Sequence, residues 1–514
     1  MIFERAHKVI CAVCLVMSGI LAADVAHASS YDCRYLDEDV DLPIIEGGEG
    51  MFFRVVQDIA MQDRFTDASV AELQALSRAL EARGTTLIVA LIPTKSSTMP
   101  HLLPAEATLM GYDQDTAVAV QRDLQQRLRN AGVVSVDLQE ALFTKEGGAH
   151  PFFGPDTHWN AYGAELAAKA IAAEIVASDR YAGMAKTQFR TTSVGEAKAF
   201  SGMRRIIQLR CRGKVPEAIT TQYATTQVAE SFATIASTQP IAGTLDIGLD
   251  IGLDDILSDG EPNDAPIDIG LGDSALDIGL ADAPLDIGLS DAPLEEGLLD
   301  IGLGDDPQDR VVGFYEDGNL PIAIVGTSFS DLEIVNYPGF VAQHSSLETV
   351  NYAITGGGKY SAITSYLTSE DFQSAPPAFL VWESPIYLNP ALNGDQPMRE
   401  LIAAAGGTCV SPMPTQVSNN GTGLMARVPL ELNTDATTLY LDTGNAGIRE
   451  VTFRFRAPDG RTRNKTITRG ERMRQNGRFY VPLTGLWSDG PIEVEILASQ
   501  PIGANAQLYS CPPI

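Results

Sequence analysis

An acidic stretch without lysine or arginine divides this chain of 514 residues into two parts. Between Asp246 and Asp309 it contains 19 aspartates and glutamates, and the tetrapeptide DIGL recurs there with a nine-residue period in its most regular part. A segment with so much charge and so little bulk cannot bury a core, so we expect a low-complexity loop over 216–310. Any compact domain must therefore be assembled from the residues on its two sides.

Nine-residue repeats of Asp and Gly can also bind calcium as β-rolls, although such repeats carry paired glycines that are missing here. A calcium-responsive segment is therefore the alternative interpretation. The stretch accounts for most of the formal net charge of −30, and the rest of the chain carries −11. A chain this acidic is a poor nucleic-acid binder, because contacts to phosphates need clustered Lys and Arg.

On both sides of the acidic stretch, short apolar β-branched runs alternate with amphipathic helical patterns. This alternation predicts an α/β fold in which a parallel sheet is covered by helices on both faces. Beyond Cys409, short alternating runs separated by turn signals predict an all-β sandwich. The predicted strands of the α/β part include 85–95, 133–138, 320–330 and 378–385, and its predicted helices include 67–83, 113–129 and 161–177.

The first 28 residues have the pattern of an export signal. Arg5 and Lys8 precede an apolar run, and small residues at the end of the segment fit a cleavage site. An uncleaved anchor is the alternative, although the run is shorter than the about 20 residues that span a bilayer. We therefore expect a periplasmic protein.

Four cysteines lie outside this segment, and four cysteines allow three pairings. They are far apart in the chain, so no CxxC redox or zinc pattern is present. Because two of them bracket the last hundred or so residues, we expect one disulfide in each part. The expected pairs are Cys33–Cys211 and Cys409–Cys511.

One histidine has the setting of a catalytic base. His158, in GPDTHWN, has an aspartate two residues before it, Asp156, next to the predicted sheet. Ser328, in VGTSFS, lies at the C-terminal end of a predicted buried strand, and open parallel sheets place their ligand sites at such strand ends. A serine hydroxyl needs a base that a third group orients. The sequence therefore predicts a nucleophile, a base and an orienting carboxylate in Ser328, His158 and Asp156.

Each of these elements also has a simpler interpretation. A Gly-x-Ser after a strand is common, and Asp-x-His before a helix can place Asp156 or Thr157 as an N-terminal cap. His150, Asp156 and His158 could bind a metal together, but no HExxH or third-histidine pattern supports this. We therefore predict no metal site.

DTHWN, VGTSFS and VWESP, in this order, resemble the alginate O-acetyltransferase family of SGNH-hydrolase-like enzymes typified by AlgX and AlgJ. In that family the Asp-x-His element precedes the serine, whereas ordinary SGNH hydrolases have the serine first. LIPTKSSTMP (91–100), the loop ITGGGKYSA and the C-terminal sandwich are similar as well. The cleavable signal and the sandwich are closer to AlgX. The acidic stretch departs from the family as an insertion.

The resemblance implies a polysaccharide acetyltransferase without a cofactor. Ser328 would take acetyl from a donor and pass it to a hydroxyl of alginate or a similar polyuronate. Backbone N–H groups near Ser328 or in Gly356, Gly357 and Gly358 are candidates for an oxyanion hole. Partners would be other envelope proteins of polysaccharide modification and export, and we expect a monomer. The expected domains are a signal peptide (1–28), a catalytic domain in two parts (29–215 and 311–408), the insertion (216–310) and a carbohydrate-binding sandwich (409–514).

Basic residues are concentrated between Arg449 and Arg478, where ten of them and three acidic residues give a net charge of +7. Spaced basic groups suit a polymer with one carboxylate per sugar, because guanidinium pairs with carboxylate in a bidentate fork. A solvated strand face is the alternative interpretation. Lys95 is expected at the rim of the active site. The predicted substrate-binding residues are Lys95, Arg454, Arg456, Arg463, Lys465 and Arg472.

Three other functions are compatible with the same sequence. An acetylesterase would use the same three residues, with water in place of the sugar hydroxyl. A non-catalytic polysaccharide-binding scaffold would need only the sandwich and its basic face. A metal hydrolase is the remaining alternative.

Overall fold

The computed structural model describes residues 29–228, 311–312 and 320–511, apart from short gaps at 60, 62–64, 389, 391–393, 395, 408, 410, 419–420, 429–436 and 488–489. The predicted export signal and the DIGL repeats lie outside the described residues. Within the described ranges, no helix is both long enough and apolar enough to cross a membrane.

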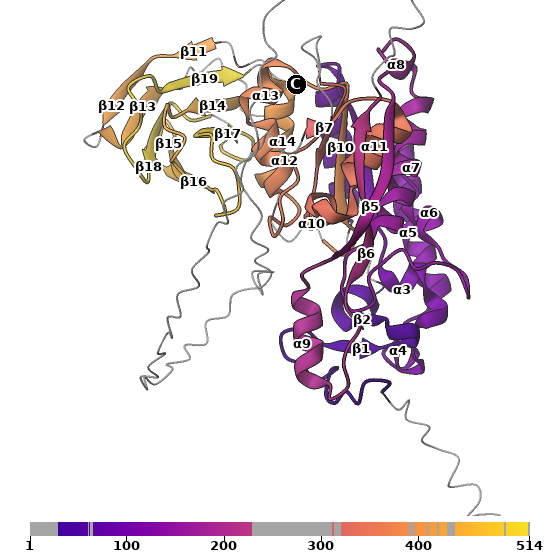
Figure 1. Ribbon diagram of the computed structural model, residues 1–514. Helices are drawn as coiled ribbons and strands as arrows, with labels where there is room; N and C mark the ends of the chain where they lie inside the picture. The colour runs from indigo at the N-terminus through magenta and orange to yellow at the C-terminus, as the bar shows by residue number, and fades with distance from the viewer. Residues whose placement is uncertain are drawn as a thin grey trace, which may run out of the picture. The chain divides into compact units, whose positions relative to one another are not determined.

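A six-stranded sheet forms the centre of the α/β part (Figure 1). Its strands follow the order β4-β3-β10-β8-β9-β7, and all neighbours are parallel except β9 and β7. Phe379 of β10 pairs with Thr86 of β3 and with Ile322 of β8, so the three central strands begin at the same edge. The strands are β3 (Thr86–Ile92), β4 (Val134–Ser135), β7 (Val311–Val312), β8 (Ile322–Val325), β9 (Thr349–Asn351) and β10 (Phe379–Pro385).

Each face of this sheet has its own hydrophobic core, because successive side chains of a strand point to opposite sides. Ile88 and Ile324 pack on one face with α6, α7 and α11. Val89 and Val325 pack on the other with α2, α5, α12 and α14. The predicted α/β fold with two covered faces is confirmed. The helices of these layers are α2 (Asp67–Glu81), α5 (Gln114–Asn130), α6 (Leu138–Leu142), α7 (Ala161–Ala177), α11 (Tyr337–Ser345), α12 (Ser361–Leu367) and α14 (Gln396–Gly406).

Shorter elements surround the sheet. The strands β1 (Ile44–Glu46) and β2 (Phe52–Arg54) pair antiparallel, as do β5 (Phe189–Lys198) and β6 (Ile219–Gln227). The pairing of β6 with β5 corrects the predicted start of the insertion at 216, because residues 219–227 belong to the folded part. The remaining helices are α3 (Lys95–Thr98), α4 (Ala105–Leu109), α8 (Asp179–Ala182), α9 (Gly202–Arg210), α10 (Ser328–Asp331) and α13 (Glu370–Ser374).

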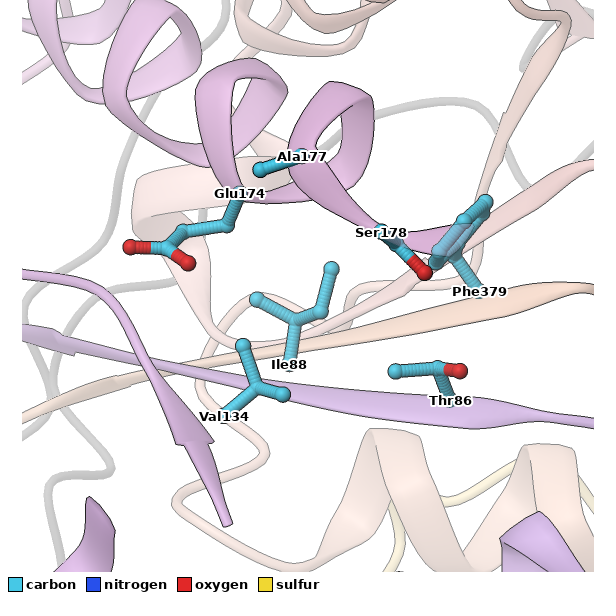
Figure 2. Close-up of a pocket in the computed structure, with 7 residues that line it drawn as sticks. All are labelled: Thr86, Ile88, Val134, Glu174, Ala177, Ser178 and Phe379. Carbon is cyan, nitrogen blue, oxygen red and sulfur yellow. The ribbon is translucent and has the colours of Figure 1, made fainter. Parts of the chain in front are cut away.

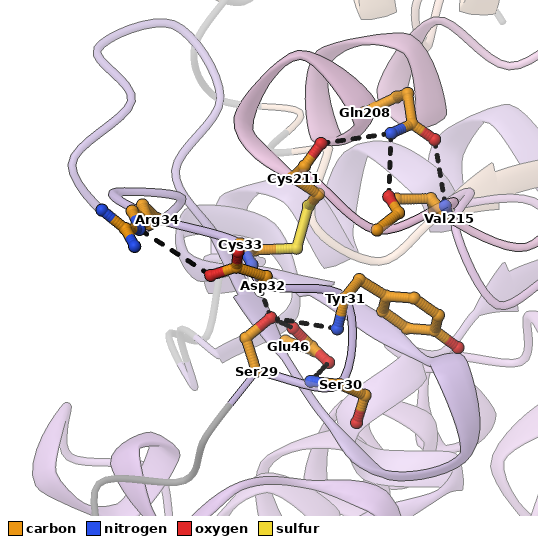
Figure 3. The surroundings of a disulfide bond; sticks show 11 residues. Ser29, Ser30, Tyr31, Asp32, Cys33, Arg34, Glu46, Gln208, Cys211 and Val215 are labelled. Atoms are coloured by element: carbon orange, nitrogen blue, oxygen red, sulfur yellow. Dashed lines mark hydrogen bonds and ion pairs between the residues drawn. A yellow bond between two sulfur atoms is a disulfide. The ribbon is translucent and has the colours of Figure 1, made fainter.

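Both expected cysteine pairs are joined. Cys33 is bonded to Cys211 just after α9 (Figure 3), and Cys409 is bonded to Cys511. Around the first disulfide, the side chain of Gln208 donates to the carbonyl of Cys211, which fixes the end of α9. In the chain-entropy model, closing loops of 100 or more residues lowers the free energy of the folded state relative to the unfolded one by about 4–5 kcal/mol each.

Residues 411–511 form two antiparallel sheets around a common hydrophobic core, which confirms the predicted sandwich (Figure 1). In β15, Val451, Phe453 and Phe455 are buried and alternate with more exposed polar residues, as expected for a strand with one inward face. One sheet contains β11 (Ser411–Met413), β19 (Gln507–Cys511), β14 (Thr438–Asp442) and β17 (Arg478–Pro482), and the other contains β12 (Thr415–Ser418), β13 (Gly423–Arg427), β18 (Glu493–Ala498), β15 (Glu450–Arg456) and β16 (Thr462–Thr468).

The sandwich is tied to the α/β part by a buried ion pair. Arg469, between β16 and β17, donates two hydrogen bonds to the carboxylate of Glu400 in α14, at 2.7 and 2.5 Å. Their side chains are only 7% and 3% exposed. The same carboxylate accepts the backbone N–H of Tyr480 in β17, and Arg469 also donates to the carbonyl of Arg478.

Candidate active site

The loop before α7 brings Asp156 and His158 together. It is closed by a hydrogen bond from the N–H of Phe153 to the carbonyl of His158. One carboxylate oxygen of Asp156 accepts the backbone N–H of His158 at 2.8 Å and lies 2.6 Å from the Nδ1 of its ring. The N-cap of α7 is Asn160, whose side chain accepts the N–H of Gly163. Neither Asp156 nor Thr157 therefore caps α7, and the alternative interpretation of these residues as a helix cap is wrong.

Ser328 reaches the same imidazole from the other part of the sequence. It is the first residue of α10, which begins three residues after β8 ends. Its Oγ lies 2.6 Å from the Nε2 of His158. The serine is therefore at the carboxyl ends of the central strands, as the sequence predicted.

The three side chains form a continuous hydrogen-bonded chain from serine to imidazole to carboxylate. Asp156 and His158 are 3% and 6% exposed. Burial disfavours the charged form of Asp156, but the charge and hydrogen bonds of His158 outweigh this and lower its pKa to about 2. The carboxylate therefore stays ionised at neutral pH. It can hold the imidazole with Nε2 directed at Ser328 and stabilise an imidazolium, which is what activation of a serine requires.

Aromatic neighbours restrict the orientation of the imidazole further. The ring of Phe329 lies 4.8 Å from the ring of His158, measured between centroids. The indole N–H of Trp159 donates to the carbonyl of Phe329 at 2.8 Å. The residues that follow His158 and Ser328 in the chain are thus bonded to each other, which ties the two loops together.

A buried glutamate of the VWESP motif, to which the sequence assigned no role, lies beneath the turn that carries Ser328. The carboxylate of Glu383 accepts the N–H of Thr327 at 2.9 Å, the hydroxyl of Thr327 at 3.0 Å and the hydroxyl of Ser330 at 2.8 Å. Burial raises the pKa of this carboxyl, although these hydrogen bonds favour its ionised form. A Cβ at Gly326 would lie 2.4 Å from the same carboxylate, so only glycine fits there. Glu383 thereby fixes the backbone on both sides of Ser328.

Glu383→Gln is expected to lower the free energy of unfolding by about 1–3 kcal/mol. The two carboxylate oxygens of Glu383 now accept from three donors, whereas the amide of glutamine has only one acceptor oxygen. Urea unfolding followed by circular dichroism measures this change. Glu140→Gln, at an exposed glutamate of α6, is the matched control and should leave the urea midpoint within error. A Glu383→Gln protein as stable as the wild type would show that the hydrogen bonds to Thr327 and Ser330 are dispensable.

Lys95 is not at the rim of the site, which corrects the prediction from sequence. Its side chain is 1% exposed, and its ammonium donates to four backbone carbonyls in the interior. The strand β3 ends at Ile92, and the following turn folds inward under the loop of Asp156 instead of remaining on the surface. The ammonium of Lys95 is therefore unavailable to a substrate.

The glycine loop after β9 lies against the helix that begins with Ser328. The N–H and hydroxyl of Thr355 both donate to the carboxylate of Asp331, in the last turn of α10, at 2.8 Å. Gly356 and Gly358 have positive φ angles of 68° and 60°, which glycine adopts without strain. The N–H of Gly357 donates to the carbonyl of Ile354, so this group is already engaged in a turn. Gly356 and Gly358 remain candidates for binding an oxyanion.

The predicted substrate-binding residues of the sandwich do not form one open basic surface. Arg454 and Arg456 pair across the sheet with Glu495 and Glu493, at 2.8 and 3.6 Å. Only Arg472 is brought to the glycine loop: a Cβ at Gly356 would lie 3.0 Å from its Nε. The side chains of Arg463 and Lys465 donate to the carbonyls of Gly485, Leu486, Pro482 and Thr484.

A pocket of about 220 Å³ lies at the end of the sheet away from Ser328, and Figure 2 shows the residues that line it. Thr86 and Phe379, which line it, are the first residues of β3 and β10, whereas Ser328 follows the last residue of β8. The pocket is therefore separate from the candidate triad. Among the described residues, no cluster of three or more His, Cys, Asp or Glu side chains is arranged to hold a metal ion.

Comparison with known proteins gives consistent matches. A family model described as the SGNH hydrolase-like domain of the acetyltransferase AlgX matches residues 44–244 and 304–386. The alginate biosynthesis protein AlgX of Pseudomonas putida is 26% identical over 71% of this chain and 61% of its own length. The probable alginate O-acetylase AlgJ of Pseudomonas fluorescens is 25% identical over 63% of this chain and 62% of its own length. The chain thus spans less than two thirds of the length of these two relatives.

The fold has a match among solved structures. The structure of Pseudomonas aeruginosa AlgX aligns with a TM-score of 0.66 over 94% of this chain and 97% of that chain. The sequence identity in this alignment is 19%, so the likeness concerns the fold alone.

Proposed function

This chain belongs to the family of SGNH hydrolase-like AlgX acetyltransferases, and we propose on that basis that it transfers acetyl groups to alginate or a similar polyuronate. The observation that carries the proposal is the hydrogen-bonded chain of Ser328, His158 and Asp156, with 2.6 Å at each of its two junctions. We place the reaction in the periplasm, in the company of other envelope proteins that modify and export the polymer. We assign polysaccharide binding to the sandwich.

The proposed reaction has two steps that share one acyl-enzyme. The Oγ of Ser328 attacks the carbonyl carbon of an acetyl donor while His158 takes the hydroxyl proton, and the imidazolium then protonates the leaving group. In the second step a sugar hydroxyl attacks acetyl-Ser328 and gives its proton to His158, which returns it to Ser328. Asp156 stabilises the imidazolium in both steps.

The negative charge that develops on the carbonyl oxygen in each step needs nearby donors. The backbone N–H groups near Ser328 and those of Gly356 and Gly358 are suited to this, because the loop is bonded to α10 through Thr355 and Asp331. Preorganised donors of this kind contribute roughly 3–4 kcal/mol each to lowering the barrier.

Mass spectrometry of the intact protein and of its peptides tests the function. The protein is incubated with an activated acetyl ester, and oligomannuronate is then added. We expect acetyl on Ser328 of the wild type, its loss on addition of the sugar, and its appearance on the sugar. Ser328→Ala should carry no acetyl. Transfer of the acetyl to water alone would make the protein an esterase, and absence of acetyl from both serine and sugar would leave only a binding scaffold.

Arg472 is proposed to hold a carboxylate of the polymer next to the acceptor hydroxyl. It is exposed, it belongs to the basic segment of the sandwich, and it packs on Gly356 of the loop beside α10. Arg472→Ala is therefore expected to raise the KM for oligomannuronate by about tenfold. A charge-assisted hydrogen bond to a carboxylate contributes enough binding free energy to change the affinity by about this factor. The rate of Ser328 acetylation by a neutral ester should not change.

The matched control is Arg122→Ala, an exposed arginine of α5 on another layer of the molecule. Steady-state kinetics at low and high salt separate the two variants. The KM of the Arg472→Ala protein should depend less on salt than that of the wild type, because one screened charge pair is missing. Equal KM values for the two variants would remove Arg472 from the acceptor site.

A further inference from the structure

The ammonium of Lys95 occupies a cage of carbonyl oxygens. Its Nζ lies 2.9 Å from the carbonyls of Phe52, Phe153 and Asp156, and 3.0 Å from that of Gly154. The four oxygens come from two distant segments, β2 and the loop that carries Asp156 and His158. Lys95 is the first residue of α3, and Thr94 is the N-cap of this helix. One buried group therefore joins three parts of the sequence at a point behind the candidate triad.

This cage is suited to a cation and to no other state of the side chain. An ammonium has three N–H donors and no lone pair, so it can share them among four oxygens. A neutral amine has two donors and a lone pair that would face a carbonyl. A hydrocarbon in its place would remove this donor from all four buried carbonyls, of which only that of Gly154 would keep a second donor that the structure shows, the N–H of Phe52. Buried acceptors that lose their donor are strongly destabilising.

The cage acts on the same residue that orients the imidazole. The carbonyl of Asp156 is bound by Lys95, while its carboxylate accepts two hydrogen bonds from His158. The main chain of the aspartate is thus fixed on one side and its side chain on the other. Because Phe153 and Gly154 are bound as well, the loop 153–158 is held from within along half of its length.

We propose that Lys95 is a positioning residue of the acetyl-transfer site, which sets the place of Asp156, and through it of His158, by binding the carbonyls of their loop as a cation. The inference rests on the function proposed above. It separates Lys95 from the substrate-binding residues: loss of the cation should lower the rate of the chemical step and leave binding of the sugar unchanged.

The proposal has a consequence for pH dependence. Burial lowers the pKa of Lys95 to about 8. Asp58 of the turn after β2 and Asp156 of the loop favour the protonated form, and Arg54 of β2 opposes it. The cation is complete below this pKa and is lost above it. The rate of Ser328 acetylation should therefore fall as the pH rises through about 8.

The test compares Lys95→Met with Lys359→Met. Lys359 is a second buried lysine whose pKa burial lowers, to about 7, but its Nζ faces aromatic rings and a carbonyl at 3.4 Å and does not contact the loop of Asp156. Acetylation of Ser328 by 4-nitrophenyl acetate is followed in single turnover from about pH 6 to about pH 10, a range that includes the lowered pKa values of both lysines. Circular dichroism in the same buffers reports whether each protein is folded.

We expect Lys95→Met to slow acetylation by about 100-fold at neutral pH, as a small displacement of reacting groups does. It should lack the alkaline decline that the wild type and Lys359→Met share, and its affinity for oligomannuronate should equal that of the wild type. If Lys95→Met does not fold, the pH profiles of the wild type and Lys359→Met decide.

Three results would overturn the proposal. The first is a folded Lys95→Met protein with the rate and pH profile of the wild type. The second is a folded wild type whose rate stays constant through pH 8 and above, or a Lys359→Met protein that has lost the decline. The third is absence of acetyl from Ser328 in the wild type, which would also remove the proposed function; in the first two cases that function stands.

Discussion

His158→Ala is expected to slow acetylation of Ser328 by roughly 10⁴- to 10⁶-fold, because the serine then has no base to take its proton. The Nε2 of His158 lies 2.6 Å from the serine oxygen, and no second base is bonded to that oxygen among the described hydrogen bonds. Stopped-flow kinetics with a chromogenic acetyl ester measures the loss. The small exposure of His158 means that the variant leaves a cavity, so its fold should be checked by circular dichroism.

Asp156→Asn provides the graded comparison for this effect. Its shape is preserved, but the amide no longer selects the tautomer with a free Nε2, so a smaller loss of roughly 10³- to 10⁴-fold is expected. Since the pKa of Asp156 is lowered to about 2, its carboxylate is fully ionised at neutral pH and the loss should not depend on pH there. A His158→Ala protein that keeps more than a few per cent of the rate would exclude His158 as the base.

Arg469→Met is expected to lower the free energy of unfolding by about 3–5 kcal/mol, because it leaves the carboxylate of Glu400 buried without its cation. The pair links α14 to the sandwich through two hydrogen bonds, and both side chains are almost wholly inaccessible to water. Urea unfolding measures the change. The double variant Arg469→Met/Glu400→Leu should recover most of it, since the uncompensated charge is gone. What remains is the loss of the acceptor of the Tyr480 N–H and of the guanidinium that donates to the carbonyl of Arg478.

Arg454→Met is the matched control for this pair. Arg454 bonds to Glu495 at a similar distance, 2.8 Å, but its side chain is 44% exposed. Water replaces the lost partner at such a site, so the effect should be far smaller than at Arg469. If both substitutions changed stability equally, burial would not be what makes the Glu400–Arg469 pair important.

The features that could be predicted from sequence have a local signal. The Asp-x-His spacing places the carboxylate of Asp156 beside the imidazole of His158, two residues later in the chain. An apolar run followed by a turn places Ser328 at the end of a strand. The helix at 161–177 was predicted with the bounds that α7 has. The strand predicted at 133–138 was too long: β4 ends at Ser135, and Asp137 caps α6. The helix α6 has too few residues for a helical hydrophobic periodicity to be visible in the sequence.

The features that could not be predicted depend on contacts between distant segments. Lys95 follows a strand and a proline, the usual setting of an exposed loop, and nothing nearby shows that carbonyls of β2 and of 153–156 converge on it. Glu383 had a detectable signal, because a charged residue inside the apolar run AFLVWESP must find buried partners. Which partners it finds, Thr327 and Ser330, depends on the neighbouring strand.

The position of β10 in the sheet determines when the two halves of the site can meet. This strand, residues 379–385, pairs with β3 on one side and with β8 on the other, and β3 and β8 do not pair with each other. Before β10 is inserted, Asp156 and His158 belong to one half-sheet and Ser328 to another. Pairings between residues this far apart in sequence form slowly. The active site should therefore mature late in folding, once β10, the last of the six strands in the sequence, has joined the two half-sheets.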